Sequence, residues 1–398
     1  MINKKALATF FAKSVTLGIS FLLVILTSRL WGAEGRGLIA LIVADIAIIS
    51  IISNIATGSS ISYYTPKIGF NSLFPSSILF GFILVIISAL GFSFFHGFHY
   101  FQFLFIVSIL IAYLTMIMSF SVARENIKLY NLVTFLMPGL TIIFVLFLYY
   151  IVGYKNVENY FYAQYLAFGL ILIYLFIMFT RKYKLKEIKL SLEATPKLLK
   201  YGVQNELSTF LQFLNNRLSY YFIAEYIGMA MLGVFSVAMS VSEAILILSR
   251  SLAIVQYSKV LNQSDQNKNI ILTKQNVILC LIATSLLMLF LVFLPASIYN
   301  YIFGKGFINV KHYTILLFPG ILILSVSNLW GNYFSAIGNL KVLKRKSALG
   351  LVVTLIFAIL LVPKYNLTGA CITMNLSYFT SSLYLFIHFL KDVKKYNR

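Results

Sequence analysis

Charge, and negative charge above all, is scarce in this sequence. Only 11 of its 398 residues are Asp or Glu, and charged residues make up 11% of the chain, whereas soluble domains carry about a quarter. The aspartates, Asp45, Asp265 and Asp392, stand too far apart to form a paired-aspartate metal motif. The phosphate-binding lysine motif of ATPases and the Gly-x-Ser-x-Gly motif of hydrolases do not occur. We therefore expect no catalytic site, no metal and no cofactor.

Cysteine is equally rare, and both cysteines, Cys280 and Cys371, fall inside apolar runs. Buried thiols of this kind usually act as small hydrophobic groups, so they indicate no disulfide framework. What the sequence has in quantity is apolar surface, because 60% of its residues are hydrophobic and its mean hydropathy is +0.90. A globular core cannot bury that much apolar surface, but a lipid bilayer can accommodate it. The composition predicts a membrane protein.

Apolar segments of spanning length recur along the whole chain. The first, 6–31, is too long for a signal-peptide core and would span roughly 39 Å as a helix. The predicted spanning helices are 6–31, 37–64, 73–95, 101–123, 128–152, 158–180, 198–225, 230–257, 270–294, 310–337, 345–363 and 366–390. We expect an all-α integral membrane fold of about twelve helices. A basic segment, 181–200, divides it into an N-lobe, 1–180, and a C-lobe, 201–398.

Basic residues are concentrated in alternate loops. The formal charge of +21 could indicate nucleic-acid binding in a soluble protein, but most of the 32 Lys and Arg lie in short segments between apolar runs. They gather at the N-terminus, in the even-numbered loops, in the 181–200 linker and in the C-terminal tail. By the positive-inside rule these parts are cytoplasmic, so both termini are expected there. We expect a lipid bilayer as partner and no nucleic acid.

A faint internal repeat relates the two halves. Gly37 opens the second predicted helix within Gly-Leu-Ile-Ala-Leu, and Gly233 opens the eighth within Leu-Gly-Val-Phe-Ser, 196 positions later. Repeats of half the chain are typical of transporters whose halves move about a site near the middle of the membrane.

Polar side chains recur at helical spacing on a few predicted helices. Helix 6–31 has Thr9, Lys13, Thr16, Ser20 and Thr27, helix 198–225 has Asn205, Thr209, Gln212, Asn216 and Tyr220, and helix 230–257 has Ser236, Ser240, Glu243, Arg250 and Tyr257. Each set lines one face. Hydroxyl residues also let membrane helices approach closely, so taken singly they favour packing. Ionisable side chains in hydrocarbon are costly, and they favour a hydrated cavity.

The candidate site residues follow from this pattern. The candidate cations are Lys13, Arg29, Arg217 and Arg250, the candidate polar lining is Asn205, Gln212 and Asn216, and the candidate acids are Asp45, Glu206 and Glu243. Three of the cations have an alternative interpretation. Lys13 lies near a helix end and could extend its ammonium to the interface, and Arg29 and Arg250 could lie at the interfaces themselves.

Several segments resemble a known family. Residues 27–37 are similar to the family's Arg-x-Leu-Gly-x-x-x-x-Gly turn, and residues 363–370 are similar to its Pro-x-x-Gly-x-x-Gly-Ala turn. Residues 216–218 and 232–238 together resemble its Asp-Arg-x and Leu-Gly-x-Tyr-x-x-Ala pattern. Residues 299–346 follow its helix 9–11 segment. Asn216 stands where the family commonly has an acid, and Asn366 where it commonly has Gly. The chain resembles the polysaccharide flippases (exporters of O-antigen and capsule repeat units) of the multidrug/oligosaccharidyl-lipid/polysaccharide superfamily.

The resemblance implies two six-helix lobes in a V around a central cavity lined by helices 1, 2, 7 and 8. It implies flipping of a polyprenyl-diphosphate-linked oligosaccharide across the bacterial inner membrane by alternating access, with a proton or sodium gradient as the expected driving force. For that function, Lys13, Arg29, Arg217 and Arg250 are the expected contacts of the diphosphate or of anionic sugars. The acids Asp45, Glu206 and Glu243 are expected either to pair with these cations or to couple a proton or sodium ion. It also implies a polysaccharide polymerase and chain-length machinery as partners. Two alternatives stay open: a cation-coupled multidrug antiporter of the same superfamily, and a membrane-embedded sugar polymerase or ligase.

Overall fold

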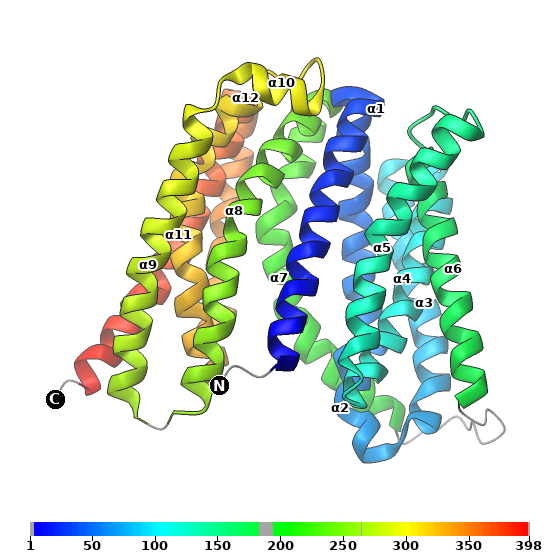
Figure 1. Ribbon diagram of the computed structural model, residues 1–398, viewed down its shortest axis with the longest axis horizontal. Coiled ribbons are helices and arrows are strands. Elements are labelled where there is room, and N and C mark those ends of the chain that lie inside the picture. The colour runs from blue at the N-terminus through cyan, green and yellow to red at the C-terminus, as the bar shows by residue number, and fades with distance from the viewer. Residues whose placement is uncertain (1–3, 183–193, 264, 397–398) are drawn as a thin grey trace. The chain divides into compact units, whose positions relative to one another are not determined.

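The computed structural model describes residues 4–182, 194–263 and 265–396, and every regular element in these ranges is a helix (Figure 1). The α-helices are α1 Lys4–Thr57, α2 Ser59–Ile68, α3 Phe70–His96, α4 Phe101–Ala123, α5 Ile127–Leu146, α6 Asn159–Lys182, α7 Ala194–Tyr226, α8 Met229–Leu261, α9 Gln266–Phe293, α10 Ala296–Phe303, α11 Val310–Ala336 and α12 Leu340–Tyr396. A 3₁₀ turn, η1 Phe98–Tyr100, precedes α4, and a π turn, η2 Phe147–Ile151, extends α5. The predicted all-α class is confirmed.

Two of these helices are each interrupted by one residue with a positive φ. In α1 the residue is Gly32, with a φ of 65°, and in α12 it is Asn366, with a φ of 51°. Glycine adopts a positive φ without a steric cost, whereas the Cβ atom of Asn366 makes it costly there. Each kink separates two predicted spanning helices.

Nine helical stretches in the described ranges are long and apolar enough to cross a membrane. Two of them, 13–68 and 340–395, contain the kinks at Gly32 and Asn366, so each corresponds to two of the predicted spanning helices. Helix α7 is not among the nine, and it corresponds to the predicted spanning helix 198–225. Large apolar side chains such as Phe94 and Phe293, 77% and 82% exposed, lie on the outer surface. Lipid can cover such surface.

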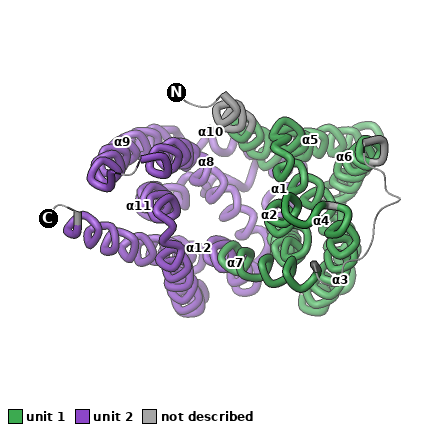
Figure 2. The backbone as a smooth tube through the Cα atoms, turned by 90° about the horizontal axis from the view of Figure 1, so that it is seen from below, with its two compact units in different colours: residues 1–26, 41–210 green, residues 27–40, 211–398 purple. Residues whose placement is uncertain are grey.

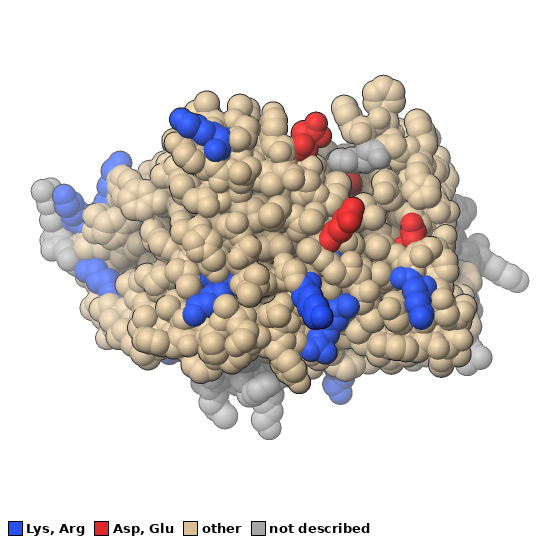
Figure 3. Space-filling view, turned by 90° about the horizontal axis from the view of Figure 1, so that it is seen from above, with Lys and Arg blue, Asp and Glu red and all other residues tan. Residues whose placement is uncertain are grey.

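The chain divides into two compact units (Figure 2). Unit 1 comprises residues 1–26 and 41–210, and unit 2 comprises residues 27–40 and 211–398. The middle of α1 therefore belongs with the C-terminal half, and α7 passes from unit 1 into unit 2. The predicted basic linker, 181–200, lies partly outside the described residues, since 183–193 are not among them. Uncharged residues form most of the surface seen in Figure 3, and charged side chains of both signs are sparse on it.

Within unit 2 the repeat found in the sequence appears as a reciprocal contact. A Cβ atom at Gly37 would overlap the carbonyl oxygen of Met229, and a Cβ atom at Gly233 would overlap the carbonyl oxygen of Ala33. Adding 196 to Ala33 and Gly37 gives Met229 and Gly233, so each half makes the same contact with the other. Small residues at such crossings let membrane helices approach to backbone contact.

Two local features differ from the expected helices. The predicted helix 37–64 is broken at Gly58, whose backbone N–H donates to the Asn54 carbonyl over 2.8 Å before α2 begins at Ser59. The short helix α10 was not predicted. It follows Pro295 and ends after eight residues at Gly304, which has a φ of 101°. An eight-residue helix lies below the length at which hydropathy is informative.

Candidate functional site

The part of α7 in unit 1 carries a buried carboxyl group. Glu206 is 7% exposed, and its Oε1 accepts hydrogen bonds from Ser59 Oγ over 3.3 Å and from Asn205 Nδ2 over 3.2 Å. Asn205 Nδ2 also donates to Ser59 Oγ over 2.7 Å. We call Ser59, Asn205 and Glu206 the α2–α7 polar cluster. A carboxyl group with neutral donors in an apolar region could take up a proton or a small cation.

Two glycines create the space for this cluster. Gly58 ends α1, so that Ser59 opens α2 directly beside α7. A Cβ atom at Gly202, one turn before Glu206, would overlap the carbonyl oxygen of Ile55, so α7 and α1 are in backbone contact there. The break and the close approach together bring the Ser59 hydroxyl within hydrogen-bonding distance of the Glu206 carboxylate.

The part of α7 in unit 2 carries an ion pair. Arg217 Nη2 lies 3.1 Å from Glu243 Oε2 of α8, and Arg217 Nη1 donates to the Tyr220 hydroxyl over 2.7 Å. The two charged side chains are 26% and 25% exposed. The acid that the resembling family commonly places directly before the arginine is Asn216 here, and Glu243 supplies the negative charge from the neighbouring helix instead.

Arg29 binds backbone groups within unit 2. Its Nε donates to the Ile302 carbonyl over 2.9 Å, and its Nη2 donates to the Tyr301 carbonyl. Both carbonyls belong to the last turn of α10, where the negative end of a helix attracts a cation. Arg29 thus links the kinked middle of α1 to α10, while its side chain stays exposed.

The remaining predicted residues fall into two groups. Lys13, Arg250 and Gln212 are exposed, Asn216 is partly exposed, and within the described ranges none of the four side chains makes a hydrogen bond or an ion pair with another residue. Asp45 is buried, with 1% of its surface exposed. The structure thus joins Asn205 to Glu206 and Arg217 to Glu243. The exposed charges among the predicted site residues are cationic, whereas the acids are buried or paired.

Sequence reasoning missed a buried polar site in unit 2. Asn215 Oδ1 accepts hydrogen bonds from Thr354 Oγ1 over 2.8 Å and from Ser377 Oγ over 2.7 Å. A Cβ atom at Gly350 would lie 2.7 Å from Asn215 Nδ2, so a glycine is needed beside it. Asn215 lies one residue off the predicted polar face of α7, and only the run of polar residues around it could have drawn attention to it.

Comparison with known proteins gives the fold. No protein-family model matches the sequence, and no curated protein matches it either. Among solved structures, the chain resembles the lipid II flippase MurJ in an inward closed conformation, with a TM-score of 0.76 and 17% identity over 98% of this chain and 89% of that one.

Two further solved structures share the fold. An inward-facing multidrug resistance MATE family transporter of the MOP superfamily has a TM-score of 0.72 and 14% identity over 96% of this chain and 94% of that one. A MOP superfamily transporter from Pyrococcus furiosus, described as having a binding pocket of reverse polarity that suggests a different function, has a TM-score of 0.60 and 14% identity over 98% and 96%. These proteins are transporters and flippases, not enzymes. The chain has the fold of the multidrug/oligosaccharidyl-lipid/polysaccharide (MOP) superfamily of membrane transporters.

Proposed function

We propose that this chain is a flippase that moves a polyprenyl-diphosphate-linked oligosaccharide from the cytoplasmic to the outer leaflet of a bacterial inner membrane by alternating access. The observation that carries the proposal is that the exposed charges among the predicted site residues are positive. Lys13 and Arg250 are exposed and have no ionic partner in the described ranges, while Glu206 is buried and Glu243 is paired with Arg217. An anionic diphosphate on a low-dielectric route is stabilised by cations that are not already neutralised.

The proposed roles follow from this division. Lys13 and Arg250 attract the diphosphate, and the amides of Asn205, Gln212 and Asn216 offer hydrogen bonds to sugar hydroxyls. Arg29 and Arg217 remain predicted substrate contacts, and both already hold partners that they would have to share. Glu206 is the proposed coupling group for a proton or sodium gradient, because its partners are a hydroxyl and an amide; Asp45 and Glu243 remain predictions for the same role. A polysaccharide polymerase and its chain-length machinery are the proposed partners.

Transport of a fluorescent polyprenyl-diphosphate oligosaccharide in proteoliposomes tests the proposal. The combined variant Lys13→Gln/Arg250→Gln should lower the flipping rate by at least about tenfold, since each exposed cation near a bound anion is worth roughly 1 kcal/mol. The charge-conserving variant Lys13→Arg/Arg250→Lys should keep most of the rate. An unchanged rate in the neutral variant would show that these cations do not meet the substrate.

A cation-coupled multidrug antiporter is the second candidate, and the likeness to MATE family transporters favours it. One fold can host pockets of different polarity and therefore different substrates, as the description of the Pyrococcus furiosus transporter also indicates. A pH gradient across the same proteoliposomes should then expel a cationic dye. Dye export without flipping of the lipid-linked glycan would replace the flippase proposal by this one.

A further inference from the structure

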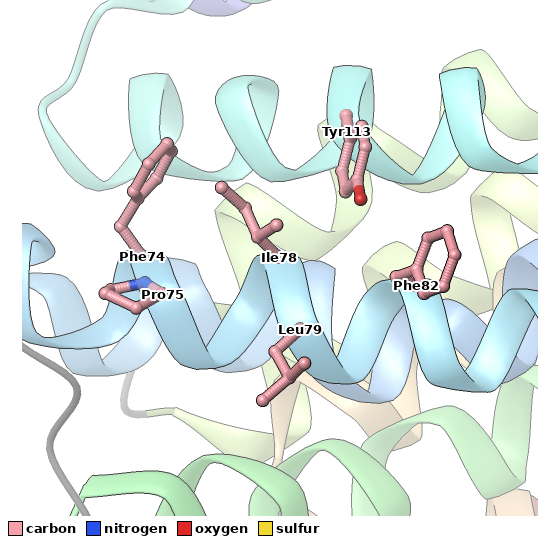
Figure 4. A pocket seen from close by; sticks show the side chains of 6 residues that line it. All are labelled: Phe74, Pro75, Ile78, Leu79, Phe82 and Tyr113. Atoms are coloured by element: carbon pink, nitrogen blue, oxygen red, sulfur yellow. The ribbon is translucent and has the colours of Figure 1, made fainter.

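Unit 1 has an apolar cavity between α3 and α4 that none of the proposed transport residues lines. Its volume is about 460 Å³. Figure 4 shows the side chains around it, five from α3 and Tyr113 from α4, and they are Phe74, Pro75, Ile78, Leu79, Phe82 and Tyr113. In this view Phe74 and Ile78 extend from α3 toward α4.

A second cavity of about 350 Å³ adjoins the first, because Phe74, Ile78 and Tyr113 line both. It extends the space to α6, which contributes Phe176 and Phe179 among other apolar side chains. Apart from Tyr113, the described residues that line it are all apolar. The two cavities form an apolar groove along α3, α4 and α6.

A third cavity of about 460 Å³ continues the groove to the end of α4, sharing Ile117 and Phe179 with the second. Its lining differs in kind, since it includes Ser121, Arg124 and Asn126. Within the described ranges Arg124 makes no ion pair, and its guanidinium lies 5.6 Å from the Phe120 ring centre. The groove thus changes from apolar to cationic along its length.

The start of α5 adds to the positive end of the groove. Asn126 is the N-cap of α5 and accepts a hydrogen bond from the Leu129 N–H over 3.3 Å. The first turn of a helix presents backbone N–H groups and a partial positive charge to an anion. Glu125, exposed between Arg124 and Asn126, offsets part of this charge but does not line the cavity.

We propose that this groove binds one anionic phospholipid of the membrane leaflet on the Arg124 side, with an acyl chain along α3, α4 and α6 and the phosphate at Arg124 and the start of α5. Tyr113 and Arg124 are eleven residues apart on α4, which corresponds to roughly 17 Å. One leaflet of a hydrocarbon core about 30 Å thick has nearly that depth. An occupant must therefore be apolar over one leaflet and anionic at its end, and basic pockets between spanning helices bind such lipids.

A site-specific fluorescence measurement tests this proposal on the full chain in lipid nanodiscs. Tyr113→Trp places a reporter in the groove, and subtracting the signal of the chain without it removes Trp31 and Trp330. Brominated phosphatidylglycerol should quench this reporter with an apparent affinity about fivefold higher than brominated phosphatidylcholine, the factor expected for one basic group beside an anionic lipid.

Variants of the cationic end separate a site from a general surface potential. Arg124→Gln should bring the fivefold preference close to one, whereas Arg124→Lys should keep most of it. Lys259→Gln removes an exposed cation from the last turn of α8, in unit 2, and should leave the preference unchanged. Equal quenching by the two lipids in the parent, or an equal loss of preference in Lys259→Gln, would overturn the proposal. Melting temperatures of all variants, measured in parallel, identify any that fail to fold; if Arg124→Gln is one of them, the comparison of the two lipids in the parent carries the test.

Discussion

The two parts of α7 hold ionisable side chains in opposite ways. In unit 1, Glu206 is buried and hydrogen-bonded to the neutral groups of Ser59 and Asn205. In unit 2, Arg217 is partly exposed and paired with Glu243. A carboxyl group surrounded by neutral donors can change its charge without breaking an ion pair, whereas removing one member of an ion pair leaves the other charge uncompensated. We therefore expect the carboxyl group of Glu206 to exchange an ion, and the ion pair of Arg217 and Glu243 to hold α7 in place beside α8.

The largest effect is expected from separating α7 from α1 in unit 1. Gly202→Val would place side-chain atoms on the Ile55 carbonyl, so the helices must move apart and the α2–α7 polar cluster must open. We expect a loss above about 3 kcal/mol, the upper range for overpacking, seen as little monodisperse protein after extraction. Gly169→Val on α6 is the control, because a Cβ atom there meets nothing within 4 Å; equal damage in both variants would contradict the account.

The next largest effect is expected at the ion pair in unit 2. Arg217→Ala leaves Glu243 without its partner and should cost about 2 kcal/mol, less than the loss typical of a fully buried pair because both side chains are about a quarter exposed. The melting temperature in detergent measures this. Adding Glu243→Ala should recover part of the loss. If the double variant loses more stability than the two single variants lose together, the pair does not act as a unit.

Glu206 should respond differently to two substitutions. Glu206→Gln keeps an acceptor for Ser59 and should change stability by less than about 1 kcal/mol, whereas Glu206→Leu removes it and should cost about 1–3 kcal/mol. In a flipping assay, Glu206→Gln should also abolish the dependence of the rate on the driving gradient. A Gln variant that loses as much stability as the Leu variant would show that the carboxylate charge itself holds the cluster.

The smallest effect is expected for a pair outside the membrane-spanning segments. Lys268 Nζ lies 3.5 Å from Asp265 Oδ2, with the side chains 68% and 45% exposed, so salt screens the attraction and Lys268→Ala should leave the melting temperature unchanged. A clear loss that disappears at high salt would reverse this expectation.

The same aspartate gives a pH dependence with a definite sign. Hydrogen bonds from the backbone N–H groups of Lys268 and Asn267, together with the charge of Lys268, lower the pKa of Asp265. Because the folded pKa lies below the unfolded one, the capping contribution is complete above the unfolded value of about 3.9 and is lost as the pH falls through the folded value. Asp265→Asn should remove this dependence from the acid unfolding of α9.

The helices could be predicted from the sequence because hydropathy reports long apolar runs directly. The fold class and the positions of the spanning segments follow from it, and Gly32 and Asn366 were found at predicted helix boundaries. The break at Gly58 was not predicted, since apolar and hydroxyl residues continue on both sides of it. Helix α10 was also missed, and with it the backbone partners of Arg29.

The contacts at the site depend on how neighbouring helices are rotated, and periodicity within one helix does not contain that information. Polar spacing selected α7 and α8 and identified Arg217 and Glu243 as candidates, but not the distance between them. The spacing points to Asn216, whereas its neighbour Asn215 is the buried residue that accepts hydrogen bonds from Thr354 and Ser377.

The reciprocal crossing of Gly37 and Gly233 has the geometry of a homodimer interface contained in one polypeptide. In an isologous contact, residue i of one copy meets residue j of the other and the reverse also holds; here the copies are the two halves of a single gene product. A bulkier residue at either glycine would therefore disturb both halves at once, because each glycine faces backbone of the other half.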